Sequence, residues 1–154
     1  MTEDVVISGA GPNGLLLAGE LALAGIRPIV LEQLPSPSTE PKANGIVGQA
    51  VRALDLRGLY STLSGSDEAP QPMHAYIFAG MQVPFLDVAD NPMYGMLIQQ
   101  PRVVRNLVDW AHDLGVEIRW GHELTGIVSH TDGVALTVIG PDGRYQFDAT
   151  YLVG

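Results

Sequence analysis

Hydrophobic and polar residues alternate along the first part of the chain in blocks that predict an α/β fold. Short apolar runs at residues 5–7 and 29–31 have the length of buried strands, and the leucine-rich segment 12–24 between them has the length of a helix. This segment is apolar almost all round, as expected for a helix packed against a sheet, and Gly25 suits a helix end. Strand, helix and strand in this order predict a parallel βαβ unit.

The middle of the chain has a different pattern. The proline-rich residues 35–41 predict a surface loop, and apolar residues at helical spacing then predict a helix from about Gly45 to Arg57. After Met73 the period becomes that of strands, which we predict at residues 75–78, 82–86 and 94–98. We expect these strands to lie outside the parallel sheet.

The last third of the sequence returns to the main sheet. A helix is predicted at residues 102–114 and a further parallel strand at 116–120. Turn residues then separate three strands that predict an antiparallel meander, at residues 124–129, 134–139 and 145–149. Residues 151–153 begin another apolar strand. Because the carboxyl ends of parallel strands usually build the binding site, we interpret the chain as the first part of a longer protein.

Composition excludes several classes of function. The 154 residues are 46% hydrophobic, which is enough for the core of one domain, and the formal net charge of −9 argues against nucleic acid or anionic membranes as partners. The absence of cysteine excludes disulfides and thiolate metal sites and fits a cytoplasmic protein. No apolar stretch of the sequence is long enough to cross a bilayer, so we expect no membrane partner.

The segment Gly9-Ala10-Gly11-Pro12-Asn13-Gly14 joins the first strand to the first helix and predicts a dinucleotide-binding loop. Gly9 would make the tight turn, Gly11 would let backbone approach a pyrophosphate, and Gly14 would let helix and strand touch. Free N–H groups of the first helical turn suit phosphate oxygens, and Pro12 has no N–H to leave unpaired. The glycine spacing alone is a weak signal, and its place between strand and helix strengthens it.

An acidic residue ends the second predicted strand. Glu32 stands where a carboxylate can accept hydrogen bonds from an adenosine ribose. Its charge disfavours the 2′-phosphate of NADP in this pocket. The motif by itself leaves FAD and NAD equally open.

Taken together, these motifs resemble a known family. The whole chain is similar to the start of the para-hydroxybenzoate hydroxylase family, most of all to its aromatic polyketide hydroxylases and the rifampicin and tetracycline monooxygenases. The resemblance rests on five motifs in order: residues 9–14, Glu32, residues 42–59, residues 100–102 and residues 151–154. It implies a Rossmann-like, truncated FAD-binding fold of glutathione-reductase type, with a β-meander and an inserted antiparallel portion. Residues 1–72 and 100–154 would bind FAD, and residues 73–99 would begin the substrate domain.

The family resemblance implies an FAD-dependent aromatic hydroxylase. NAD(P)H would visit as a transient co-substrate, and oxygen would be transferred to a phenolic or polyketide ring. Flavin chemistry needs no serine, histidine and acid constellation, and the sequence identifies no catalytic residue. Relatives continue with further flavin-binding motifs, so we expect the 154 residues alone to be inactive and to self-associate.

By position, the resemblance also assigns residues to the cofactor. Glu32 would bind the adenosine ribose, Gln33 would lie beside the adenosine, and Leu124 would contact adenine through its backbone. Lys42 replaces a family arginine that reaches the phosphates, so the bidentate contact is lost. Gln100 would lie near the ribityl chain, and the pyrophosphate would contact the glycine loop at Gly9, Gly11, Pro12, Asn13 and Gly14.

Two alternatives stay open, an NAD-linked Rossmann oxidoreductase and a non-catalytic nucleotide-binding remnant. No metal site is predicted, because the histidines at 74, 112, 122 and 130 lack ligand spacing. Methionines occur where relatives begin their substrate pocket, at positions 73, 81, 93 and 96. Their flexible side chains suit either a bulky ring or an ordinary core.

Overall fold

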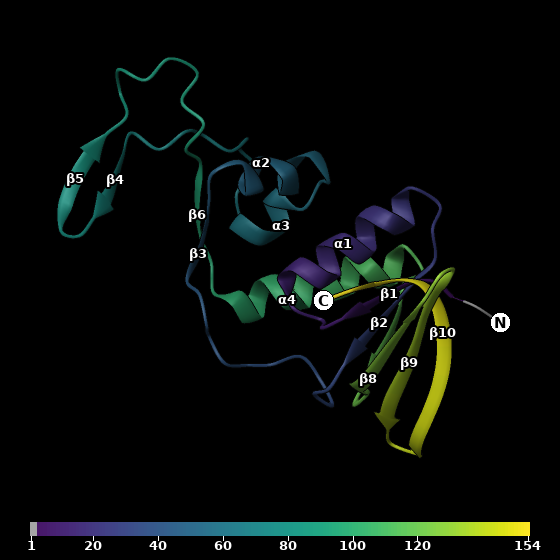
Figure 1. Ribbon diagram of the computed structural model, residues 1–154. Coiled ribbons are helices and arrows are strands. Elements are labelled where there is room, and N and C mark those ends of the chain that lie inside the picture. Colours follow the sequence, from purple (N-terminus) through teal and green to yellow (C-terminus); the bar gives the residue numbers. More distant parts are fainter. Residues whose placement is uncertain (1–2) are drawn as a thin grey trace. The chain divides into compact units, whose positions relative to one another are not determined.

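The computed structural model describes residues 3–154 and divides the chain into two compact units (Figure 1). The first unit combines Met1–Glu40 with Val104–Gly154, and the second is Pro41–Val103. The compact units divide the chain after residues 40 and 103. The boundaries predicted after residues 72 and 99 concern function instead, and they stay a prediction.

A six-stranded sheet with the order β7-β2-β1-β10-β9-β8 forms the centre of the first unit. Its parallel half contains β1 (Glu3–Ser8), β2 (Pro28–Glu32), β7 (Glu117–Trp120) and the end of β10 (Gly143–Val153). The antiparallel half adds β8 (Glu123–His130) and β9 (Gly133–Gly140). The predicted α/β class, the parallel βαβ unit and the meander are therefore present.

Strand β10 corrects one detail of the prediction. Residues 145–149 and 151–153 belong to one continuous strand of 11 residues, and no turn separates them. One edge of the strand pairs with β9 over Gly143–Ala149, and the other edge pairs with β1 over Ala149–Val153. Because the two pairings use opposite edges, one extended segment belongs to both halves of the sheet.

The core of the first unit lies between the two halves of this sheet. Alternate residues of β1 and β2 are buried against the meander. The cluster contains Val6, Ile29, Leu31, Val134, Leu136, Val138 and Ala149. The intervening residues Val5, Ile7 and Val30 are buried on the opposite face, where α1 (Pro12–Leu23) packs.

Helix α4 (Gln100–Asp113) lies alongside α1 (Figure 1). The two helices meet where the Trp110 ring packs directly on Gly19, at a position where a β-carbon would overlap the ring. The predicted start of this helix at residue 102 is two residues late, since the structure begins it at Gln100.

The second unit contains two small two-stranded sheets separate from the main one, as predicted. One pairs β3 (Gly45–Val47) with β6 (Gly95–Leu97), and the other is the hairpin of β4 (Ala75–Phe78) and β5 (Met81–Pro84). The hairpin turns at Ala79 and Gly80, which both have positive φ. β4 has the predicted bounds, whereas β5 begins one residue before the predicted strand at 82–86 and ends two residues before its end.

The helix predicted from Gly45 to Arg57 is wrong in its first turn. Helix α2 begins at Gln49 and ends at Leu56, because residues 45–47 pair with β6 instead. Gly48 separates strand from helix with a φ of +73°, and its N–H donates to the Tyr94 carbonyl. A second short helix, α3 (Tyr60–Ser64), was not predicted, although the buried pair Leu59 and Leu63 has helical spacing.

Candidate functional site

The glycine loop connects β1 directly to α1. Gly9 has a φ of +110°, a conformation that favours glycine, and its N–H donates to the Leu31 carbonyl at 2.7 Å. Gly11 is the N-cap residue of α1, and a β-carbon added there would meet no atom within 4 Å. The turn predicted at Gly9 is therefore present, and the space in front of Gly11 is open.

Gly14 has a different environment from Gly11. A β-carbon at Gly14 would overlap the carbonyl oxygen of Gly9 and would lie 3.3 Å from the Ile7 side chain. Both neighbours belong to the end of β1 or the turn after it. The helix can approach the strand this closely only because residue 14 has no side chain, as the motif predicts.

The amino end of α1 is free to receive an anion. Pro12 occupies the first turn, no side chain caps the helix, and its first turn has no acidic residue. Leu15 makes the first helical hydrogen bond, to the Gly11 carbonyl at 3.0 Å, so the amides of Asn13 and Gly14 precede the helical ladder. Open amides and the positive end of the helix dipole together favour a phosphate group.

Glu32 ends β2 with its carboxylate against the glycine loop. Its Oε2 accepts the Ala10 N–H at 2.8 Å, and its Oε1 accepts the Leu34 N–H at 2.9 Å. Each oxygen still has acceptor capacity, because a carboxylate oxygen has two lone pairs. Glu32 lies at the end of the strand, as the sequence predicts, and it also holds the loop, which the sequence did not indicate. Gln33 follows it and is exposed.

The connection between β7 and β8 completes this end of the sheet. Gly121 N–H donates to the Leu34 carbonyl and His122 N–H to the Glu32 carbonyl, both at 2.8 Å. Leu124 follows on β8, half-buried against the core. The structure thus brings together the glycine loop, the segment after Glu32 and the segment leading to Leu124.

Lys42 and Gln100 belong to the second unit. They lie at the same end of the ribbon of β3 and β6, since the Gln100 N–H donates to the Ala43 carbonyl at 2.9 Å. Lys42 is exposed and Gln100 is half-buried. The two residues assigned to the phosphate and ribityl region are therefore neighbours.

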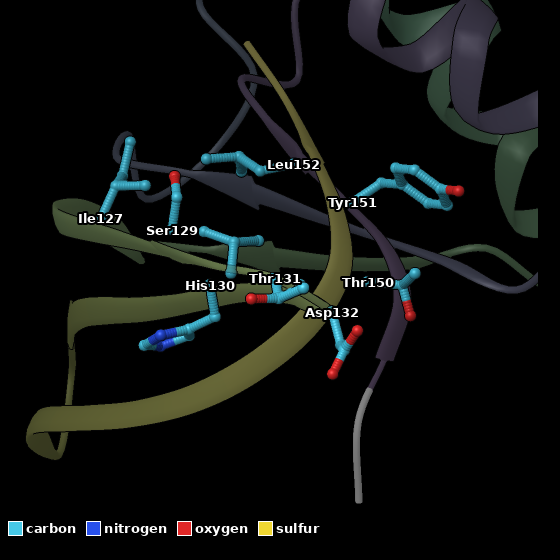
Figure 2. Close-up of a pocket in the computed structure, with 10 residues that line it drawn as sticks. Ile127, Ser129, His130, Thr131, Asp132, Thr150, Tyr151 and Leu152 are labelled. Atoms are coloured by element: carbon cyan, nitrogen blue, oxygen red, sulfur yellow. The ribbon is translucent and has the colours of Figure 1, made fainter.

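Other candidate sites are weaker. A hollow of about 510 Å³ next to the turn between β8 and β9 contains His130 and Asp132 in its lining, but Figure 2 shows these two side chains pointing apart. Within residues 3–154, no cluster of three or more histidine, aspartate or glutamate residues could hold a metal ion. The methionines do not form one pocket, because Met96 is buried while Met81 is 65% exposed on the hairpin.

No helix in the described part of the chain is long and apolar enough to span a membrane.

Comparison with known proteins agrees with this geometry. The chain is 42% identical to a 12-dehydrotetracycline 5-monooxygenase/anhydrotetracycline 6-monooxygenase of Streptomyces rimosus over 156 residues, covering 100% of this chain and 30% of that protein. A rifampicin monooxygenase of Streptomyces venezuelae is 34% identical, with coverages of 98% and 31%. The chain thus spans about a third of the length of these relatives.

Solved structures show the same fold. An anhydrotetracycline hydroxylase from Streptomyces rimosus superposes with a TM-score of 0.88 at 39% identity, covering 100% of this chain and 31% of that one. An aklavinone-11 hydroxylase solved with FAD and aklavinone gives a TM-score of 0.77 at 27% identity, with coverages of 99% and 32%. Residues 2–154 match the family model described as FAD binding domain. The chain therefore belongs to this family of FAD-binding domains, as the order of its motifs predicts.

Proposed function

We propose that this chain is the part of an FAD-dependent aromatic hydroxylase that holds the adenosine half of FAD. The observation that carries the proposal is the meeting of the uncapped α1 amino end with the Glu32 carboxylate at the carboxyl ends of β1 and β2. A dinucleotide requires hydrogen-bond donors for its phosphates and an acceptor for its ribose hydroxyls at this edge of a sheet. The membership in the FAD-binding family supports FAD as that dinucleotide.

The residues fit the cofactor in the following way. Open space at Gly11 admits a pyrophosphate close to the backbone, and the amides of Asn13 and Gly14 donate to it. Glu32 accepts the ribose hydroxyls with its remaining lone pairs, and Gln33 and the Leu124 backbone flank the adenosine. Gly9 and Pro12 shape the loop, while Lys42 reaches the phosphates and Gln100 lies near the ribityl chain.

FAD, when bound, supplies the oxidising chemistry, and the protein positions the substrate and excludes water. We propose an aromatic substrate of the phenolic or polyketide class, with NAD(P)H as transient reductant. The similarity to the tetracycline, rifampicin and aklavinone enzymes supports this class. The finer fold assignment that we propose is a Rossmann-like domain of glutathione-reductase type, which is supported by the parallel βαβ unit and the meander.

We expect these 154 residues to prefer FAD over NAD by at least about tenfold, which corresponds to about 1.4 kcal/mol. Both ligands have the adenosine and pyrophosphate, but only FAD offers the ribityl chain that Gln100 would meet. Equilibrium dialysis with the two ligands side by side measures the preference. Gln100→Ala should reduce it, whereas the exposed neighbour Gln99→Ala should not. Equal or tighter NAD binding would instead support the NAD-linked oxidoreductase.

We also propose that the chain self-associates through one face of the hairpin of β4 and β5. Cross-strand pairing puts four apolar side chains on this face, and 39–66% of each is exposed: Tyr76, Phe78, Met81 and Val83. A lone two-stranded hairpin is marginally stable, and an exposed apolar face favours association.

Phe78→Ser should weaken this self-association by about tenfold or more, because burial of a large apolar side chain contributes about 1.5–3 kcal/mol. Ile77→Ser is the matched control, since Ile77 is 72% exposed on the opposite face of the hairpin. Sedimentation equilibrium measures the dissociation constant of each variant. A chain that stays monomeric at high concentration contradicts the proposal, and an equal effect of both variants contradicts the choice of face.

A further inference from the structure

His122 lies in the segment that connects β7 to the adenosine end of the site. Its backbone N–H is bonded to the Glu32 carbonyl at 2.8 Å, and the preceding Gly121 is bonded to Leu34 at the same distance. Gly121 has a φ of +73°, so this segment turns sharply before it enters β8. The backbone at Leu124, two residues later, is what the proposed function places against adenine.

The His122 imidazole is held in place by the meander. Its Nδ1 lies 2.8 Å from the Tyr145 hydroxyl, and the two rings meet edge to face with centroids 5.7 Å apart. Gly140 leaves room for the ring, because a β-carbon there would lie 2.8 Å from both Cε1 and Nδ1 of His122. The imidazole therefore has a fixed position although the residue lies in a connecting segment.

Tyr145 is itself positioned by its neighbours. Its ring stacks on Phe147 with centroids 5.9 Å apart and an interplanar angle of 19°. The Arg119 guanidinium lies 5.6 Å from the Phe147 ring centroid and bonds Glu117 at 2.7 Å. Burial alone would lower the pKa of Arg119, but its hydrogen bonds with Glu117 and Tyr145 raise that pKa above its usual value.

We propose that His122 and Tyr145 are positioning residues for the adenosine end of FAD. The imidazole and hydroxyl fasten the segment 121–124 to the meander, and this segment presents the Leu124 backbone to adenine while its amides hold the chain around Glu32. The inference rests on the proposed function and adds two residues that the sequence motifs did not indicate. Neither residue is expected to touch the phosphates.

The test compares ADP with inorganic pyrophosphate as ligands of the 154-residue chain. ADP carries both the adenosine and the pyrophosphate, whereas pyrophosphate reports only on the amino end of α1. His122→Ala and Tyr145→Phe should weaken ADP about tenfold and leave pyrophosphate within about twofold, since both variants lose the part-buried hydrogen bond between imidazole and hydroxyl and the order it imposes. Tyr145→Phe also loses the hydrogen bond between its hydroxyl and Arg119. Gly140→Ala, which displaces the imidazole without removing it, should act in the same direction. Chemical-shift titration of the isotope-labelled protein measures each affinity.

Matched controls come from exposed residues of the same types. His130→Ala and Tyr151→Phe should change neither affinity, because His130 is exposed at the end of β8 and Tyr151 is exposed on β10, six residues beyond Tyr145. If His122→Ala does not fold, as judged by thermal melting, Tyr145→Phe decides the question, because it removes a single oxygen and keeps the stacked ring.

Three outcomes distinguish the positioning role of His122 and Tyr145 from the proposed function on which it rests. Selective loss of ADP affinity supports the positioning role. Unchanged ADP affinity, or equal loss of ADP and pyrophosphate, overturns that role while the binding site itself stands. A wild-type chain that binds neither ligand overturns the proposed function and the inference with it.

Discussion

Glu32→Ala is expected to weaken FAD binding by about 10- to 150-fold. The carboxylate would accept hydrogen bonds from the adenosine ribose, and hydrogen bonds to a charged group contribute about 1.5–3 kcal/mol. The variant also frees the amides of Ala10 and Leu34, which the carboxylate holds at 2.8 and 2.9 Å. Both effects act in the same direction, because a loosened glycine loop also presents its amides less well to the pyrophosphate.

Two further variants separate these contributions. Glu32→Gln keeps an acceptor oxygen and the length of the side chain while removing the charge. We therefore expect its FAD affinity to lie between that of the wild type and that of the alanine variant. Asp148→Ala removes the same charge from an exposed position on β10 and should leave affinity unchanged. Fluorescence titration of FAD measures all three. Unchanged affinity in Glu32→Ala would show that this carboxylate only holds the loop or is solvated.

Alanine substitutions at Gly11 and Gly14 should affect the stability of the fold differently. Gly14→Ala should lower the free energy of unfolding by about 1–3 kcal/mol, because the new methyl group overlaps the Gly9 carbonyl. This overlap can be relieved only if the backbone moves. Gly11→Ala should change the free energy of unfolding by less than about 0.5 kcal/mol, since a β-carbon there meets no atom within 4 Å.

For FAD affinity we expect Gly11→Ala, the variant with the smaller effect on stability, to have a large effect. Gly11→Ala places its methyl group where the pyrophosphate must approach, so we expect FAD affinity to fall about tenfold or more although the fold is intact. Thermal melting without ligand, followed by FAD titration, distinguishes the two roles. A Gly11→Ala variant that binds FAD like wild type would exclude close approach of the pyrophosphate at this residue.

The positions of the glycines and of Glu32 in the candidate site could be predicted from the sequence, because they depend on short spacings along the chain. A strand, three glycines and a helix are joined by tight connections, so the position of Gly9, Gly11 and Gly14 follows from the order of residues. Glu32 ends the adjacent parallel strand, and parallel pairing of β1 with β2 brings it to the loop. The family and its cofactor followed only when these two motifs were joined by those at residues 42–59, 100–102 and 151–154, and both are confirmed. The assignment of individual residues to FAD stays a prediction.

Errors occurred where a long-range partner overrides local preference. Residues 45–47 have helical spacing with the segment after them, yet they form β3 because β6 supplies hydrogen bonds. The division of β10 into two strands was wrong for a related reason. Its two edges pair with different strands, and no local pattern reveals which edge is used.

The sequence by itself determined the α/β class, the tight turn of the glycine loop, the acid at the strand end and the family to which the chain belongs. Only the tertiary structure decided that Glu32 also holds the glycine loop and that His122 meets Tyr145, a residue 23 positions away. Such contacts depend on how the sheet folds back on itself, which depends on burial of its two apolar faces rather than on any spacing along the chain.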